Sequence, residues 1–593
     1  MQRYVAFVWE ADDVGSGESV ARLASRFRDD SAAPNPRWAC ALERAGLLIF
    51  QQVSGPRAER VSILPEQAGV IIGQLFPDLP LNKLTLTRLL GSRGQTLVDD
   101  HWGGYVAFLY DASERVHYVV RDPSGQMPCY WLHVRRVNVF FAALADVLPL
   151  AESGLTINWS SVRTFLRSED LRVRETAFNE ITEVFAGERV TLSGGEDSAS
   201  SLWDPARVCA TGWLSDTTAA AAELRRVTES CVAAWAHVSG PLLLNLSGGF
   251  DSAVVLGCLS RIASSLHVTA VNRFLPYPDE DERPFARAAA ARASIELVEW
   301  AWGASGVDLE RLLTVPLLMP RPSVQSLGLI ELDERMRLAR RTGATATWTG
   351  QGGDHLFYQM KTPLFVADHL RRCGLGAGLG RLIDQAARLT QQSYASILRT
   401  LLASLAGRTI ERERPDTFLS REVIHESPQR RHPWFAAAAH LPPAKRLQNA
   451  AIVDLVHRPA PCEPLEAAPE CHPLISQPLI ETCLRIPSDV LLHEGRLRGL
   501  AHEAFRAYVP EQILNRDSKG ATRSYLVRIV RENVQLIREC LLDGLLMSEQ
   551  LLDRSRLEAH LIKDQPLRPG QLFPLLSCVT AELWLRSARQ RTY

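Results

Sequence analysis

The sequence has 593 residues, of which 46% are hydrophobic and 22% are charged, and its formal net charge is −1. This length predicts at least two domains with ample core, and the balanced charge disfavours a general nucleic-acid or acidic-lipid binder. The eleven cysteines include no C-x-x-C pair, which argues against a zinc site or a disulfide scaffold. No signal-peptide pattern or membrane-length apolar run occurs, so we expect a cytoplasmic protein without nucleic-acid or membrane partners.

The first 195 residues are predicted to form a β-rich domain. Alternating apolar residues between turn signals indicate antiparallel strands, which we place at 4–9, 46–52, 69–76, 105–110, 116–121, 130–134 and 137–144. A helix is expected over 18–28. The polar stretch 193–201 is typical of a flexible boundary. A helix over 224–238 then leads into a second domain, which we place at 215–593.

The stretch 241–252 organises the second domain. Residues 241–246 are apolar and predict a short buried strand, and 247–252 read Ser-Gly-Gly-Phe-Asp-Ser before an apolar helix. Glycines let the backbone approach a ligand closely, and a helix start attracts phosphate. Asp251 would be repelled by bare phosphate, so its presence indicates Mg²⁺ between the two. An ordinary glycine-rich turn is the alternative, and the full string after a buried strand disfavours it.

Strands alternate with helices through residue 349, which predicts a doubly wound parallel sheet. The further strands are expected at 266–271, 295–300 and 344–349, and the helices at 282–293 and 327–341. Ligands bind beyond the carboxyl ends of such strands. The last strand runs into Gly-Gln-Gly-Gly-Asp, so we expect Asp354 to share one Mg²⁺ with Asp251, although a helix N-cap is the simpler alternative. Residues 365–593 are expected to be mostly helical.

Several motifs resemble those of known families. The 247–252 string resembles the signature of the PP-loop ATP pyrophosphatases, which cleave ATP between the α and β phosphates. Segments 102–108, 121–125 and 128–130 look like the glutaminase domain of asparagine synthetases, and 350–357 and 509–520 look like that family's second ATP motif and lysine-bearing segment. The resemblance implies an α/β protein: an N-terminal Ntn-type antiparallel αββα domain, then a PP-loop synthetase domain with a helical C-terminal part.

The resemblance also implies roles for single residues. It implies that ATP and pyrophosphate contact Ser247, Gly248, Gly249, Asp251, Ser252, Gly350 and Gly352, with an adenine contact at Val271. It implies that Asp251 and Asp354 hold Mg²⁺. Lys519, one of only five lysines, matches the lysine that stabilises charge during acyl-adenylate chemistry, whereas a solvated surface lysine is the plain alternative.

The chain also departs from the family pattern. Glutamine-using members carry a nucleophilic cysteine directly after the initiator methionine, and here that position is Gln2. We therefore expect a first domain without glutaminase activity, acting as a scaffold or as a docking surface. Gln351 replaces a glutamate near the amide-forming centre, and Ser476 stands where the family has an aspartate near the acceptor site. These changes disfavour plain asparagine synthesis.

These observations predict an ATP-dependent carbon–nitrogen ligase that forms an acyl-adenylate and releases AMP and pyrophosphate. The lasso-peptide cyclase or macrolactam synthetase branch is favoured, with a precursor peptide as substrate and a leader-peptide protease or recognition protein as partner. Alternatives are an asparagine-synthetase-like amidotransferase using glutamine or ammonia, and a β-lactam or carbapenam synthetase, in which Tyr358 would need a glutamate partner. A non-catalytic scaffold relative belongs to a different class, and Asp251, Asp354 and Lys519 argue against it.

Overall fold

A computed structural model of the chain describes most of its residues, and every structural statement below concerns these. They are 3–33, 36–53, 60–151, 154–167, 173–194, 197–262, 266–274, 281–301, 309–314, 319–376, 378–406, 418–425, 432–458, 468–516, 522–562 and 570–589. Gln2 and Lys519 therefore lie outside the described residues. None of the helices in these ranges is long and apolar enough to span a membrane.

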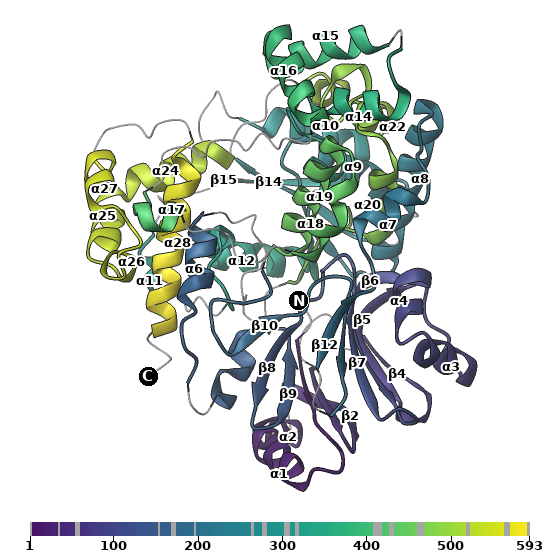
Figure 1. Cartoon of the computed structure of the whole chain (residues 1–593), viewed down its shortest axis with the longest axis vertical. Helices are drawn as coiled ribbons and strands as arrows, with labels where there is room; N and C mark the ends of the chain where they lie inside the picture. The colour runs from purple at the N-terminus through teal and green to yellow at the C-terminus, as the bar shows by residue number, and fades with distance from the viewer. Residues whose placement is uncertain are drawn as a thin grey trace.

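Two stacked antiparallel sheets form the first domain, each six-stranded in the described part of the chain (Figure 1). The first sheet has the order β10 (Ile181–Glu183), β8 (Tyr130–Val134), β9 (Val137–Phe141), β1 (Tyr4–Val8), β3 (Leu47–Gln52) and β2 (Trp38–Arg44). The second has the order β12 (Ser198–Ser201), β11 (Glu188–Leu192), β7 (Val116–Arg121), β6 (Trp102–Asp111), β5 (Gly69–Phe76) and β4 (Val61–Ile63).

Apolar side chains on alternate strand positions fill the space between the two sheets, because successive residues of a strand face opposite sides. Ala6 and Phe140 from the first sheet meet Ile72 and Phe108 from the second. Helices α1 (Val14–Leu23) and α2 (Ser25–Ser31) cover the outer face of the first sheet, and α3 (Lys83–Gly91) and α4 (Gln95–Asp100) that of the second. The domain is thus the expected αββα sandwich.

Two expectations for this domain were wrong. The polar stretch 193–201 is not a flexible linker throughout, because Ser198–Ser201 pairs with β11 as an edge strand, which extends the sheet past residue 195. The expected helix over 18–28 is interrupted, since α1 ends at Leu23 and α2 begins at Ser25. Backbone hydrogen bonds from a neighbouring strand made Ser198–Ser201 extended despite its weak strand propensity.

The second domain contains a parallel sheet, five-stranded within the described ranges. Its order is β15 (Glu296–Ala301), β14 (Val268–Phe274), β13 (Leu242–Asn245), β16 (Ala346–Trp348) and β17 (Glu470–Cys471). The chain leaves β13 toward β14 and later returns to its other side as β16. Such a reversal of strand order opens a crevice at the carboxyl ends of the two strands. The loops after β13 and β16 therefore meet there.

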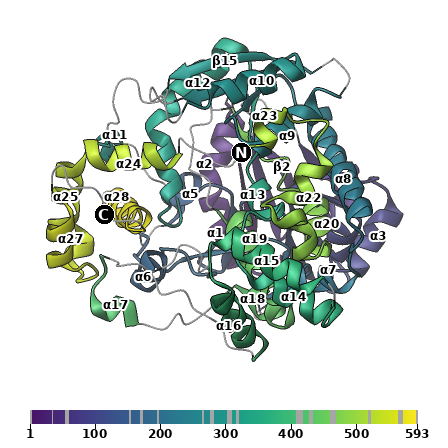
Figure 2. The same cartoon turned by 90° about the horizontal axis from the view of Figure 1, so that it is seen from above.

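Helices surround this sheet and fill the rest of the domain, as expected (Figure 1). One group packs on the sheet or on the helices that cover it: α8 (Thr217–His237), α9 (Phe250–Leu259), α10 (Arg283–Ala293), α12 (Leu332–Thr342), α13 (Gly353–Leu356), α14 (Leu364–Cys373), α15 (Leu379–Thr390), α16 (Tyr394–Leu405), α18 (Pro433–Ala437), α19 (Pro443–Val456), α20 (Gln477–Arg485), α21 (Ser488–Leu491), α22 (Gly499–Ala504) and α23 (Glu511–Leu514). A second group lies to one side (Figure 2): α24 (Thr522–Glu532), α25 (Val534–Leu542), α26 (Leu545–Ser548), α27 (Arg554–His560) and α28 (Leu572–Arg589). The remaining helices are α5 (Leu144–Val147), α6 (Trp159–Arg167), α7 (Pro205–Ala210), α11 (Arg311–Thr314) and α17 (Arg421–His425).

The two domains share their hydrophobic cores. One cluster joins Tyr105 of the second sheet to Leu244 and Trp348 of the parallel sheet. Another joins Phe7 of the first sheet to Trp584 of α28. Because each cluster draws on both domains, the free energy of burying these side chains depends on both being folded.

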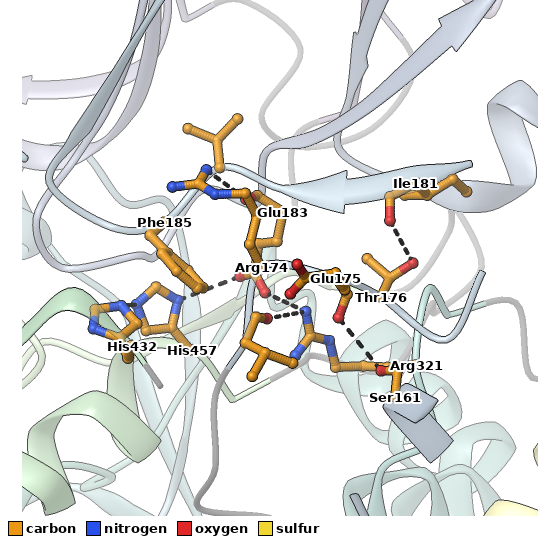
Figure 3. Close-up of polar contacts among 12 residues, drawn as sticks. Ser161, Arg174, Glu175, Thr176, Ile181, Glu183, Phe185, Arg321, His432 and His457 are labelled. Carbon is orange, nitrogen blue, oxygen red and sulfur yellow. Dashed lines mark hydrogen bonds and ion pairs between the residues drawn. The ribbon is translucent and has the colours of Figure 1, made fainter. Parts of the chain in front are cut away.

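A buried charged network also crosses the domain boundary (Figure 3). The carboxylate of Glu183 in β10 accepts hydrogen bonds from Arg121 at 3.0 Å and from Arg321 at 2.9 Å. Nδ1 of His457, at the end of α19, lies 3.3 Å from the same carboxylate. Burial by itself would raise the pKa of Glu183, but Arg321 and His457 outweigh it and hold that pKa well below its usual range. Glu183 is therefore an anion, which satisfies its buried cationic partners.

The hydrogen bonds assign the protons of two adjoining histidines. The backbone N–H of Trp434 donates to Nδ1 of His432 at 3.2 Å, so a neutral His432 carries its proton on Nε2. That nitrogen lies 2.8 Å from Nε2 of His457, which must then accept, leaving Nδ1 of His457 to donate to Glu183. Both tautomers are thus assigned from the order of hydrogen-bond donors and acceptors. A further proton on either ring would place two donors face to face.

Candidate active site

The 247–252 loop joins β13 to α9 in a compact turn. Ser252 Oγ lies 3.2 Å from both the backbone nitrogen and Oγ of Ser247, and it donates to the carbonyl of Gly249 at 3.2 Å. Gly248 has a φ of +74°, and a Cβ there would lie 2.8 Å from the carbonyl oxygen of Glu282, so only glycine fits. Gly249 is the N-cap of α9, whose first N–H groups favour an anion.

The loop after β16 interlocks with this turn. A Cβ on Gly353 would lie only 2.4 Å from Cγ of Asp251, and one on Gly350 only 2.5 Å from the backbone nitrogen of Ser252. Gly352, with a φ of +105°, turns the chain into α13. The absence of side chains lets the two backbones approach. Asp354 is thereby brought beside Asp251.

Arg498 links these two carboxylates. It precedes α22 and forms ion pairs with Asp251, at 3.1 Å, and with Asp354. The Asp251 side chain is only 7% exposed whereas that of Asp354 is 43% exposed. Asp251 therefore forms the buried side of the carboxylate pair and Asp354 its solvent-facing side, and the guanidinium offsets one of their two negative charges.

The donor set fits Mg²⁺ that arrives with phosphates. Mg²⁺ is usually held by one or two carboxylates together with substrate phosphates and water, which is what Asp251 and Asp354 offer. The described residues contain no group of three or more His, Cys, Asp or Glu that could hold a metal alone. We therefore read the pair as half of a site whose remaining oxygens come from a ligand.

A cavity of about 480 Å³ opens beside the start of α9. Gly249 and Phe250 form one wall, and its charged lining residues in the described part of the chain are all cations: Lys361, Arg388, Arg496, Arg498 and Arg516. His502 also lines it, and burial, followed by Arg496 and Arg498, lowers its pKa to about 4. Such a cavity attracts polyanions and offers guanidinium donors to phosphate oxygens.

Arg516 ties another segment to the first loop. Its guanidinium forms two 2.6 Å bonds to the carboxylate of Glu282 and contacts the carbonyl of Gly248 at 3.3 Å. Lys519 follows three positions later and lies outside the described residues.

Among the described residues that the sequence assigned to ATP, pyrophosphate or Mg²⁺, only Gly249 lines the cavity. Three others singled out by the sequence are buried in packing. Val271 is 2% exposed and packs with Leu243 and Leu338, so its adenine contact stays a prediction. Ser476 is buried, accepting from Trp235 Nε1 at 3.0 Å. Tyr358 is fully buried, and its hydroxyl donates to a backbone carbonyl, that of Ala444, at 3.3 Å.

Gln351 lies at the carboxyl end of β16. Its backbone N–H donates to Thr349 Oγ1 at 3.1 Å, and that oxygen lies 2.7 Å from Nδ1 of His472. The side-chain amide is therefore carried by a loop that a histidine of the β17 region supports. The position is at the crevice, as the motif predicts.

Sequence reasoning did not assign a role to Arg498, Arg516 or Glu282. Arg516 lies in the 509–520 segment that resembles the family, whereas Arg498 ends a Gly-Arg-Leu-Arg stretch to which the sequence gave no role. Charge gave a further signal, because two carboxylates and a phosphate ligand at one place require cations nearby. Which arginine supplies them depends on contacts between residues more than two hundred positions apart.

Comparisons with known proteins agree with this architecture. Residues 223–586 match the family model described as asparagine synthase, and residues 84–203 match that of a glutamine amidotransferase domain. No curated protein matches the chain. Similar solved structures include an allosteric regulatory enzyme of purine biosynthesis, at 8% identity and a TM-score of 0.20, covering 50% of this chain and 74% of that one. Another is the glutamine phosphoribosylpyrophosphate amidotransferase from B. subtilis complexed with ADP and GMP, at 9% identity and a TM-score of 0.20, covering 58% and 81%. These TM-scores are too low to carry an argument.

Proposed function

This chain belongs to the asparagine synthase family and is an ATP-dependent ligase, and from that premise we propose that it closes a macrolactam of the lasso type in a precursor peptide. The observation that supports ATP chemistry most directly is the pairing of Asp251 and Asp354 through Arg498, which also lines a cavity whose charged residues are cations. The cavity suits the pyrophosphate end of ATP, and the carboxylates suit Mg²⁺.

The proposed reaction has two steps. A side-chain carboxylate oxygen of the peptide attacks the α-phosphorus of ATP, which forms an acyl-adenylate and expels pyrophosphate. The peptide's N-terminal amine then attacks the acyl carbon, loses a proton and expels AMP, so the peptide loses one water in total. Asp251 and Asp354 would hold Mg²⁺, which neutralises the phosphates; Arg498 and Arg516 would bind phosphate oxygens. Lys519 would stabilise the charge that develops on the acyl and phosphate oxygens.

The thiols described in the first domain do not suit glutamine hydrolysis. A cysteine nucleophile needs a lowered pKa. Burial raises the pKa of Cys129 to about 12, and burial together with Glu43 raises that of Cys40. Gln351, a neutral amide, cannot act as a base at the crevice. These features favour an amine already present in the substrate over ammonia released from glutamine.

Pyrophosphate release tests the proposal. Purified full-length protein with ATP and Mg²⁺ is given a leader-free core peptide, aspartate with ammonia, or aspartate with glutamine. We expect release with the peptide, accompanied by loss of one water from its mass, and no release from Asp251→Asn, whose cooperative thermal unfolding would show that the fold is kept. Asparagine formation in either other arm would contradict the macrolactam and assign an amidotransferase. A leader-peptide protease or recognition protein is the proposed partner, because the ring-forming amine must first be exposed.

A further inference from the structure

A second cavity, of about 170 Å³, lies among the helices and away from the cationic cavity of the candidate active site. Trp213, from the segment between the domains, and Pro442 and Pro487, at the starts of α19 and α21, give it flat apolar walls. Lys445 of α19 and Arg371 and Arg372 of α14 supply cations. None of these residues takes part in the proposed chemistry.

Lys445 is an unusual residue to find at this depth, being 1% exposed. Its ammonium donates to Oε1 of Gln448 at 2.7 Å and to the carbonyl of Cys483 at 3.0 Å. An ammonium has three donors, so one N–H remains after these two neutral acceptors. Burial lowers the pKa of Lys445 to about 8, which still leaves the amine mostly charged at pH 7.

The acidic groups near the cavity are already engaged. Asp368 accepts the backbone N–H groups of Ala444 and Lys445, at 2.9 and 3.1 Å, and the hydroxyl of Ser488 at 2.8 Å. Asp489 pairs with Arg372 at 2.8 Å. Arg371, by contrast, donates to a neutral carbonyl, that of Ser404. The donors to Asp368 are uncharged and leave its negative charge in place, so Lys445 and Arg371 exceed it by one positive charge.

We propose that this cavity binds a small organic carboxylate with a flat apolar body and that its occupancy modulates nucleotide binding. The ligand's carboxylate would accept a hydrogen bond from Lys445, and its apolar body would lie against Trp213. A buried cation beside an indole favours a ligand with both features. The volume suits a molecule of about ten non-hydrogen atoms and excludes a nucleotide.

Hydrogen bonds connect this cavity to the candidate active site. Gln448, which accepts from Lys445, donates to the carbonyl of Leu356 at 3.1 Å, and Leu356 ends the short helix that carries Asp354. Tyr358 joins the same region to Ala444 through its hydroxyl and accepts the N–H of Arg498 at 3.4 Å. A ligand that changes the bonding of Lys445 thus acts on elements that hold Asp354 and Arg498.

Benzoate is the probe we would use, with benzamide as its uncharged control, on the full-length protein by titration calorimetry. We expect benzoate to bind at one site and benzamide to bind at least about tenfold more weakly, since a charged hydrogen bond is lost. Lys445→Met should weaken benzoate by a similar factor. Trp213→Leu and Arg371→Gln, at the wall and rim of the cavity, should also weaken benzoate binding. Because neither substitution removes a bond of Lys445, they test the site even if Lys445→Met fails to fold.

Two comparisons decide the proposal independently of the function proposed above. Asp251→Asn should leave benzoate affinity unchanged, because the cavity is separate from the active site. Benzoate should also shift the dissociation constant of Mg²⁺–ATP in the parent protein but not in Trp213→Leu, and ATP should shift that of benzoate by the same factor. Equal binding of benzamide, or benzoate binding that all three cavity variants leave unchanged, would overturn the site. Unchanged ATP affinity would overturn its regulatory role.

Discussion

Arg498 brings a positive charge between two carboxylates that lie on the helices following different strands of the parallel sheet. Asp251 is nearly buried and would be costly to ionise without a cation nearby. In this structure the guanidinium supplies that charge, and Mg²⁺ would supply it when nucleotide is bound. The same two oxygen groups thus have two cationic partners, one covalently part of the chain and one brought by substrate.

Removing the guanidinium of Arg498 tests whether it and Mg²⁺ neutralise the same two carboxylates. Arg498→Gln should lower the free energy of unfolding by about 3 kcal/mol, because Asp251 loses a buried partner. Millimolar Mg²⁺ should recover part of that loss in the variant while changing the parent protein little. Thermal unfolding with and without Mg²⁺ measures both effects. A variant as stable as the parent, with no response to Mg²⁺, would mean that the carboxylates do not depend on Arg498.

Gly353 is the residue at which the two loops touch most closely. Gly353→Ala would place a Cβ 2.4 Å from Cγ of Asp251, so the loops must separate, at a cost of about 1–3 kcal/mol and with loss of pyrophosphate release. Gly380→Ala in α15 is the matched control, since a Cβ there meets nothing within 4 Å. That control should stabilise the helix by up to about 1 kcal/mol. Equal effects of the two substitutions would contradict the interlocking.

The sequence predicted the residues of these two loops but not how they are completed. Loop residues follow strand ends directly, so local pattern places Asp251 and Asp354 at one edge of the sheet. Arg498 reaches them from a segment far along the chain, and no local pattern encodes that approach. Ser476 and Tyr358 lie near motifs in the sequence, and packing buries both, which local pattern does not predict.

At the scale of elements, α18 and α19 carry His432 and His457 into the charged network around Glu183. Burial is the main cause that lowers the pKa of His432 well below its usual range, and a charge on the neighbouring His457 would lower it further. Arg174 and Arg121 also face this histidine and oppose its protonation, whereas Glu183 favours it. The hydrogen-bond order described above likewise leaves no position for an added proton. The joint between the domains is therefore built for neutral histidines.

Acid should weaken this joint. The unfolded chain binds a proton at His432 near pH 6.5, but the folded chain does so only at lower pH, so this contribution is present above pH 6.5 and is lost below it. We expect a loss of up to about 1.4 kcal/mol per pH unit from this group. Denaturant unfolding at pH 7.5, 6.5 and 5.5 measures it, and His432→Gln should flatten the slope. Because His117, His355 and His502 titrate in the same direction, the difference between the two proteins is the relevant quantity; parallel slopes would contradict the prediction.

Long, strongly patterned elements were predictable, and short ones were not. The strands Gly69–Phe76, Val116–Arg121 and Tyr130–Val134 were predicted with the observed bounds, because each alternates or is continuously apolar between turn signals. β17 has only two residues, and Glu470–Cys471 becomes a strand only by pairing with β16. Such short strands form only by pairing with strands distant in the sequence, so the local sequence does little to predict them.

For the whole molecule, the shared cores predict one cooperative unit. A fragment of residues 1–203 would lose the second-domain side of both clusters, for example Trp235 against Phe76 and Trp102. We expect it to aggregate or to bind a hydrophobic dye without a sharp melting transition. The full chain, measured alongside, should unfold in a single transition. A soluble fragment with its own cooperative melt would show that the αββα sandwich stands alone.

The contact between Gly125 and α19 limits how the two domains can change during evolution. A Cβ on Gly125 would lie 2.2 Å from the carbonyl of Val456, and the adjacent Gln126 donates to the carbonyl of Ile475 at 2.7 Å. A turn of the first domain is thus moulded to the backbone of the second. Exchange of the first domain with that of a relative by recombination would break this fit, so the two halves must diverge together, and a functional chimaera would need matched changes on both sides of the seam.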